Sequence, residues 1–215
     1  MKNVSIKLIY NICLSLFIVY VIGYSIYYIV ADSRCKYSSY TLYNEQIELE
    51  YNKSKCLLVE AVQQYIDSIS PYSSLNGLLL VNKCIEYDID ICFVLAQAQK
   101  ESNFGTTGLA RKTNSVWNVY AYDNTKYSEI NDLGKYSNPN YSIEPYLKLL
   151  RKRYLSNKTE YDLMIKYIDI DGNRYASDKV YEASLLSIYN NIITTTLIDL
   201  YSQDFKKYQM IYNNK

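Results

Sequence analysis

The chain opens with an apolar stretch that is long enough to cross a bilayer. Residues 8–31 carry no charged side chain, and a transmembrane helix needs about 20 apolar residues. A cleaved signal peptide would have a shorter apolar region and a small-x-small cleavage site, and neither is evident. We therefore predict an uncleaved, single-pass membrane anchor over residues 1–31. Its orientation stays open, because basic residues flank the stretch on both sides.

Beyond the anchor, the hydrophobic pattern changes near residue 57. Residues 32–56 are polar and rich in Tyr, without a sustained apolar period, and we expect them to form a stalk. From residue 57 onward, apolar side chains recur at helical spacing until Pro71 interrupts the helix. The first such set is Leu58, Val62, Tyr65, Ile66 and Ile69. We therefore assign residues 57–215 to one folded domain.

The rest of this domain is predicted to be mainly helical. Apolar spacing indicates further helices over about 74–87, 91–103, 140–155, 159–168 and 178–211. Residues 105–136 lack this spacing, and short strands are expected around 116–122. The pattern thus predicts a mainly α fold of the α+β kind, with one small β insertion.

The composition removes several classes of function. The chain has no His, so Ser-His-Asp and Cys-His catalysis and the usual zinc hydrolase sites are excluded. A net charge of +1 gives no field that would attract nucleic acid. The five cysteines form no C-x-x-C pair, which argues against a zinc ribbon or a redox motif. Hydrolysis by this chain must depend on carboxylates, Tyr, Lys or Ser, and we predict no cofactor.

One acidic segment superficially suggests a calcium loop. Residues 169–173 read Asp-Ile-Asp-Gly-Asn. The segment lacks the remaining ligands and the closing Glu of an EF-hand. We interpret it as a plain turn and predict no metal site.

Glu101 stands out as the candidate acid. Val94, Ala98 and Glu101 follow i, i+4, i+7 spacing, so the carboxyl continues the apolar face of its helix. Desolvation of such a carboxyl raises its pKa, because the charged form loses its water. A carboxyl that stays protonated near neutral pH can act as a general acid in glycosidic cleavage. The alternative is an ordinary surface glutamate beside Lys100.

The helix that carries Glu101 resembles the signature of a known family. Residues 94–105 read Val-Leu-Ala-Gln-Ala-Gln-Lys-Glu-Ser-Asn-Phe-Gly. They resemble the motif L-A-Q-A-x-x-E-S-x-W/F-G of the N-acetylglucosaminidases of glycoside hydrolase family 73. This family includes bacterial autolysins, flagellar peptidoglycan hydrolases and phage lysins. Glu101 matches its catalytic acid.

Further segments resemble the family in the same order along residues 60–195. Leu109-Ala110 is similar to "S-x-L-A", and residues 114–119 are similar to "N-N-L-F-G-I", with Asn118 in place of Gly. Residues 136–150 resemble the helix with "Y-x-S…Y-x-x-L-L". Residues 175–181 are similar to "Y-A-T-D-P-x-Y", and residues 65–72 are similar to "F-I-x-x-I-x-P-Y".

The resemblance implies a lysozyme-like fold, in which an α-lobe and a small, shortened β-hairpin lobe flank a glycan groove. It implies hydrolysis of the β-1,4 bond between N-acetylglucosamine and N-acetylmuramic acid, with Glu101 protonating the leaving oxygen. Tyr175 matches a family tyrosine that would hold the substrate or stabilise positive charge, and a packed aromatic is the alternative. The expected substrate-binding residues are Asn114, Trp117, Tyr120 and Tyr181, of which Trp117 also fits a core residue and Asn114 a structural hydrogen-bonder.

The second carboxylate of the family is harder to place. Family members often carry it in a "T-x-E-Y" hairpin, and this chain is several residues shorter between Trp117 and Tyr136. The nearest fit is Thr125-Lys126-Tyr127-Ser128-Glu129, which makes Glu129 the candidate. Asp123 and Asp132 are its rivals, and a solvated loop glutamate is the alternative. An inverting mechanism would use this group to activate water at a separation of roughly 6.5–9.5 Å from the acid.

Three functions fit these patterns. The first is an active N-acetylglucosaminidase, the second is a weakly active or inactive glycan-binding module on the same fold, and the third is a lytic transglycosylase. The expected partners are the peptidoglycan glycan strand and the membrane, with the domain on the cell-wall side. A composition low in His and rich in Tyr, Asn, Ile and Lys is typical of an AT-rich genome, which fits a bacterial autolysin or a phage lysin.

Overall fold

The computed structural model of the chain describes residues 2–119 and 134–214. At the N-terminus it describes side chains from Leu16 onward, except those of Cys35, Tyr37 and Ser39. The chain forms two compact units. The first comprises Met1–Glu50 with Ile211–Lys215, and the second comprises Tyr51–Met210.

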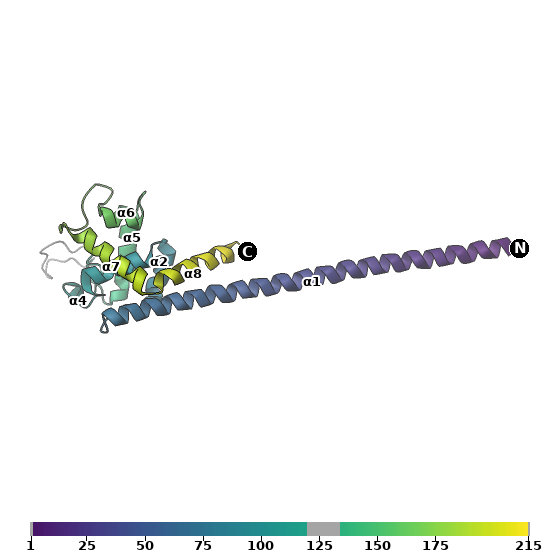
Figure 1. The fold of residues 1–215 in the computed structure, drawn as a ribbon, viewed down its shortest axis with the longest axis horizontal. Coiled ribbons are helices and arrows are strands. Elements are labelled where there is room, and N and C mark those ends of the chain that lie inside the picture. Colours follow the sequence, from purple (N-terminus) through teal and green to yellow (C-terminus); the bar gives the residue numbers. More distant parts are fainter. Residues whose placement is uncertain (1, 120–133, 215) are drawn as a thin grey trace. The chain divides into compact units, whose positions relative to one another are not determined.

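Helices account for nearly all of the regular structure in the described residues (Figure 1). In chain order they are α1 (Lys2–Ile69), α2 (Gly77–Tyr87), α3 (Ile91–Ser102), α4 (Ala110–Thr113), the 3-10 turn η3 (Pro139–Ser142), α5 (Ile143–Leu149), the π-helical turn η4 (Leu150–Tyr154), α6 (Glu160–Ile165), α7 (Tyr181–Thr195) and α8 (Ile198–Asn213). The expectation of a mainly α fold is therefore confirmed.

The expected β-hairpin lobe has no counterpart in the described residues. Residues 116–119 form turns rather than the start of a strand. The rest of the expected hairpin, residues 120–133, lies outside the described residues. Within the described ranges, the only β contact is an isolated antiparallel bridge between Ile168 and Arg174.

Helix α1 runs through the segment that was expected to be a stalk. The helix does not begin near residue 58, as the apolar pattern suggested, but at Lys2. No Gly or Pro occurs between Gly23 and Pro71, so nothing in the sequence breaks the helix over this distance. The second compact unit begins at Tyr51 rather than at residue 57.

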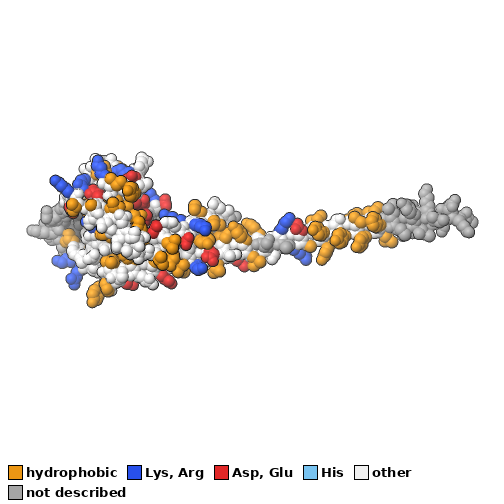
Figure 2. Space-filling model, in the orientation of Figure 1, with side chains coloured by type: hydrophobic (Ala, Val, Ile, Leu, Met, Phe, Trp, Pro, Cys, Tyr) orange, Lys and Arg blue, Asp and Glu red, His pale blue; other side chains and the backbone are white. Residues whose placement is uncertain are grey.

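The N-terminal part of α1 is apolar and exposed within its unit. Leu16–Arg34 is long and apolar enough to cross a membrane, and its hydrophobic side chains face outward along the helix (Figure 2). Exposed apolar surface on this scale is unfavourable in water. An apolar N-terminal helix is therefore present, as predicted, and its properties fit a membrane anchor or a signal sequence.

Helix α3 is the centre of the second unit. Every residue from Ile91 to Ala98 is buried, and the helix packs most extensively against α7. Asp90 caps its N-terminus by accepting hydrogen bonds from the backbone N–H groups of Cys92 and Phe93. Because the helix is packed on all sides, its last turn holds the side chains that it carries in fixed positions.

Candidate active site

Glu101 lies in the last turn of α3, and the residues that follow this helix adopt left-handed backbone conformations. Asn103, Phe104 and Gly105 follow with φ values of 45°, 56° and 86°. A left-handed conformation is uncommon for a residue as large as Phe, and Phe104 is fully buried. Such strain persists only where the surroundings enforce it, and it is concentrated at functional sites.

Glu101 is half-buried at the edge of a cleft of about 650 Å3. The cleft lies within the second unit, and aromatic and polar side chains dominate its walls. They are contributed by the loop after α4, by α5 and η4, and by the segment from residue 169 to the start of α7. The lining residues are Glu101, Asn118, Val119, Leu149, Arg153, Tyr154, Asp169, Asn173, Arg174, Tyr175, Ala176, Ser177, Asp178 and Tyr181.

Among the described residues, two side chains hold the Glu101 carboxylate in place. The Tyr181 hydroxyl donates a hydrogen bond of 2.5 Å to Glu101 Oε1. Asn118 Nδ2 lies 3.3 Å from Glu101 Oε2 and 3.2 Å from the Glu101 backbone oxygen. Asn118 adopts a left-handed conformation with φ of 50°, which Asn tolerates better than most residues. The carboxylate is thus fixed on both oxygens by groups from α7 and from the loop after α4.

A buried amide extends this network into the core. Gln97, which is fully buried, accepts hydrogen bonds at Oε1 from Tyr146 at 2.6 Å and from Tyr167 at 2.9 Å. Its Nε2 donates to the Tyr181 hydroxyl at 3.3 Å. Because the amide donates to Tyr181, the Tyr181 hydroxyl proton is directed to Glu101.

Tyr175 packs against Tyr167, one of the tyrosines of this network. Its ring stacks on Tyr167 with 4.4 Å between centroids, and its hydroxyl donates to the Trp117 backbone oxygen at 3.1 Å. Burial raises the pKa of Tyr175 and of Tyr181 well above the usual value for tyrosine, and the charge of Glu101 raises both further. Both hydroxyls therefore stay protonated at neutral pH and act as hydrogen-bond donors.

A comparison with models of protein families finds a match to the sequence of this chain. The model of the family described as "Glucosaminidase: Mannosyl-glycoprotein endo-beta-N-acetylglucosaminidase" matches residues 79–194. The chain belongs to the glucosaminidase family. The resemblance to glycoside hydrolase family 73 is therefore confirmed. The match covers α3 with Glu101 and the whole segment that lines the cleft. None of the curated proteins compared with this chain matches it.

For Trp117 of the glucosaminidase domain, the structure favours the core alternative over a contact with substrate. Trp117 has no exposed surface, stacks on Tyr146 with 4.4 Å between centroids, and donates from Nε1 to the Val94 backbone oxygen. A side chain in this position belongs to the core and cannot touch a sugar. Its place in the motif reflects the packing that holds α3, rather than a direct contact with substrate.

The other expected site residues of the glucosaminidase domain fall in three places. Tyr175 and Tyr181 line the cleft with Glu101, whereas Asn114 lines a separate hollow and donates from Nδ2 to the Tyr136 backbone oxygen. Tyr120, Glu129, Asp123 and Asp132 lie outside the described residues. Gln97 and Asn118 are not among the predicted site residues, although Gln97 stands in the family motif as a polar residue on a buried helix.

The segment 169–173 forms a turn around Asp169. Its Oδ1 accepts hydrogen bonds from the backbone N–H groups of Asp171 and Asn173, and its Oδ2 accepts one from Arg153 at 2.7 Å. Burial alone would raise the pKa of Asp169, but the hydrogen bonds outweigh it and lower the pKa to about 2. No group of three potential metal ligands occurs in the described part of the chain.

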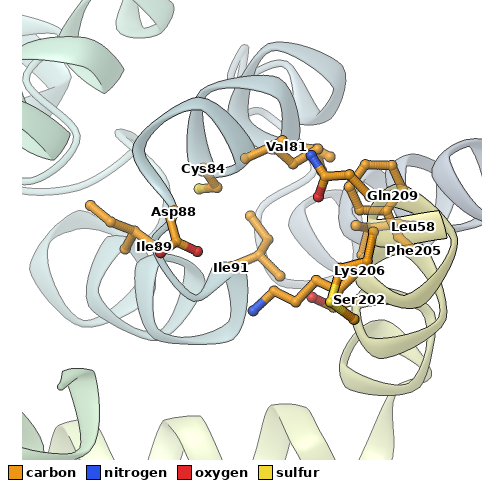
Figure 3. Close-up of a pocket in the computed structure, with 12 residues that line it drawn as sticks. Leu58, Val81, Cys84, Asp88, Ile89, Ile91, Ser202, Phe205, Lys206 and Gln209 are labelled. Atoms are coloured by element: carbon orange, nitrogen blue, oxygen red, sulfur yellow. The ribbon is translucent and has the colours of Figure 1, made fainter. Parts of the chain in front are cut away.

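A second pocket of the same unit is unlike the cleft. It lies beside α2 and α8 and is lined by apolar side chains, including Val81, Ile91 and Phe205 (Figure 3). Asp88 is the carboxylate in its lining, and its side chain is 88% exposed and pairs with Arg151. No half-buried carboxyl from the described part of the chain faces this pocket, so these residues do not supply it with the group that acid catalysis requires.

Proposed function

We propose that this protein hydrolyses the β-1,4 bond between N-acetylglucosamine and N-acetylmuramic acid in peptidoglycan, with Glu101 as the general acid. The observation that supports this most directly is the position of Glu101: a half-buried carboxyl at the end of a rigid helix, oriented by Tyr181 and Asn118 at the edge of a cleft. Family membership supports a glycan hydrolase in general.

In the proposed reaction, Glu101 donates its proton to the glycosidic oxygen as the bond from this oxygen to the anomeric carbon breaks. Water then adds to the anomeric carbon and loses a proton, so that the products are two sugar ends with free hydroxyls. Tyr175 lines the same cleft, and its ring suits packing against a sugar near the reacting carbon, while its hydroxyl bond to the Trp117 backbone oxygen holds the ring in place. Glu129 remains our candidate for the base that activates water.

The decisive experiment is digestion of purified peptidoglycan by the full chain in detergent, followed by mass spectrometry of the products. We expect new reducing ends that carry N-acetylglucosamine. Anhydro-sugar ends would instead identify a lytic transglycosylase, and the absence of cleavage with retained binding would identify a glycan-binding module. Either of these results would overturn the proposed reaction.

We further propose that the apolar N-terminal helix keeps the protein in the membrane with the glucosaminidase domain on the cell-wall side. The long uncharged stretch supports an anchor, because its exposed hydrophobic side chains match the length of a bilayer core. Peptidoglycan lies outside the cytoplasmic membrane, so the domain reaches its substrate only in this orientation.

A further inference from the structure

A separate polar hollow lies on the surface of the glucosaminidase domain. It has a volume of about 580 Å3 and is bounded by residues 72–74, 104–106, Arg111, Asn114 and Pro139. Its walls come from four segments that are far apart in the sequence. It shares no lining residue with the cleft that contains Glu101.

Side-chain hydrogen bonds tie the walls of this hollow together. Ser73 Oγ donates to the Phe104 backbone oxygen at 2.8 Å, and Ser70 Oγ lies 2.8 Å from Thr106 Oγ1. Asn140 Nδ2 also donates to the Ser74 backbone oxygen at 3.0 Å. The hollow is therefore a fixed feature of the fold, prepared before any ligand binds.

Two side chains, those of Tyr72 and Arg111, determine which kind of ligand suits this hollow. Tyr72 is 94% exposed, so nearly its whole ring is available to a ligand. Arg111 is also exposed, and it takes part in no ion pair among the described residues. Among the described residues, no Asp or Glu lines the hollow. An open aromatic ring beside an uncompensated guanidinium suits a sugar that bears a carboxylate.

The hollow lies close to the proposed reaction centre along two segments of the chain. Gly105 follows Glu101 by four residues, and Asn114 precedes Asn118 by four. Four residues span at most about 15 Å even when fully extended. The hollow and Glu101 are therefore near enough for one glycan strand of a few sugars to contact both.

We propose that this hollow binds a carboxylate-bearing muramyl unit of the glycan strand, away from the bond that is cleaved. The Tyr72 ring packs on a sugar face, and Arg111 pairs with the carboxylate. This inference rests on the proposed function. The carboxylate is the lactyl group where the muramic acid carries no peptide. Where a stem peptide is attached, the lactyl carboxyl is consumed in an amide bond, and the carboxylates of the peptide take its place in pairing with Arg111.

The test measures dissociation constants by calorimetry with the full chain in detergent. Three probes are compared: an oligomer of N-acetylglucosamine, a peptide-free glycan fragment that contains muramic acid, and the same fragment with its stem peptides. The Glu101→Gln background prevents cleavage during the measurement. Arg111→Ala and Tyr72→Ala are the test variants. Lys112→Ala is the matched control, because Lys112 is an exposed neighbouring cation that does not line the hollow.

We expect Arg111→Ala to weaken binding of the carboxylate-bearing probes by about 5- to 10-fold and to leave the N-acetylglucosamine oligomer unaffected. Tyr72→Ala should weaken binding of all three probes. A loss that Arg111→Ala causes with the peptide-free fragment assigns the lactyl carboxylate, and a loss confined to the peptide-bearing fragment assigns the stem peptide.

Unchanged binding of every probe by Arg111→Ala would overturn the proposal. An equal loss of affinity in Lys112→Ala would also overturn it. So would a loss of affinity for the neutral oligomer in Arg111→Ala as large as that for the carboxylate-bearing probes. These results are independent of catalysis. If wild type binds with this pattern but releases no cleaved product, the proposed reaction fails while the binding site stands.

Discussion

Gln97 connects the buried tyrosines of the core to the carboxylate of Glu101. Its two amide atoms serve three hydroxyls, those of Tyr146, Tyr167 and Tyr181. In a buried network of this kind every member depends on the others, because an unpaired polar group away from water is costly. The orientation of Glu101 is therefore coupled to the packing of α3.

Replacement of Gln97 tests this coupling. Gln97→Leu leaves three buried hydroxyls without their amide partner, and each unsatisfied group costs about 1–3 kcal/mol. We expect the free energy of unfolding to fall by at least about 2 kcal/mol, measured by urea denaturation in detergent. Gln64→Leu, at an exposed position of α1, is the control and should change it little. Equal stability of the two variants would show that the network contributes nothing.

The sequence predicts part of this site. The spacing of Val94, Ala98 and Glu101 indicates that the carboxyl faces the packed side of its helix, and the structure has it half-buried there. The role of Gln97 could not be derived from spacing, because its partners lie 49 to 84 residues away. The contact of Asn118 with Glu101 depends on a left-handed backbone that periodicity does not reveal.

Among the elements, the turn at residues 169–173 shows how a motif can mislead. Its acidic residues suggest a cation loop, but the Asp169 carboxylate is already occupied by two backbone N–H groups and by Arg153. Helix α1 shows that residues 32–56, which lack an apolar period, are nevertheless helical, since no Gly or Pro interrupts the helix after Gly23. That this segment serves as a stalk stays a prediction. Periodicity reports which face is buried, and not whether a helix forms.

The pKa of Asp169 predicts a pH dependence for this turn. Because its folded-state pKa is about 2, below the ordinary 3.8, Asp169 stabilises the fold above pH 4 and loses this contribution as the pH falls to 2. We expect Asp169→Asn to lower the free energy of unfolding by up to about 2 kcal/mol at pH 7. The difference from wild type should shrink towards zero near pH 2. A difference that is the same at both pH values would contradict this assignment.

At the scale of the whole molecule, the chain divides its tasks between two units. The apolar stretch Leu16–Arg34 belongs to the first unit, and every residue that lines the cleft belongs to the second. The family match, at residues 79–194, also falls within the second unit. The proposed membrane attachment and the proposed glycan hydrolysis therefore fall in different parts of the sequence.

Cell fractionation tests the proposed anchor. We expect the full chain to stay with membranes after alkaline carbonate washing and to keep its complete mass, because an uncleaved transmembrane helix leaves the bilayer only in detergent. Deletion of residues 2–31 should release the protein. Recovery of a shorter chain that lacks the apolar stretch would show instead that this stretch is a cleaved signal sequence.

The proposed role of Glu101 as the general acid is tested most directly by the cleavage rate of Glu101→Gln on purified peptidoglycan. Gln keeps the size of the side chain but has no proton to donate to the leaving oxygen, so we expect the rate to fall by about 100- to 10,000-fold. Thermal unfolding should stay nearly unchanged, and Glu60→Gln, at an exposed position of α1, should retain full activity. Cleavage at the wild-type rate by a folded Glu101→Gln protein would contradict the assignment of Glu101 as the acid.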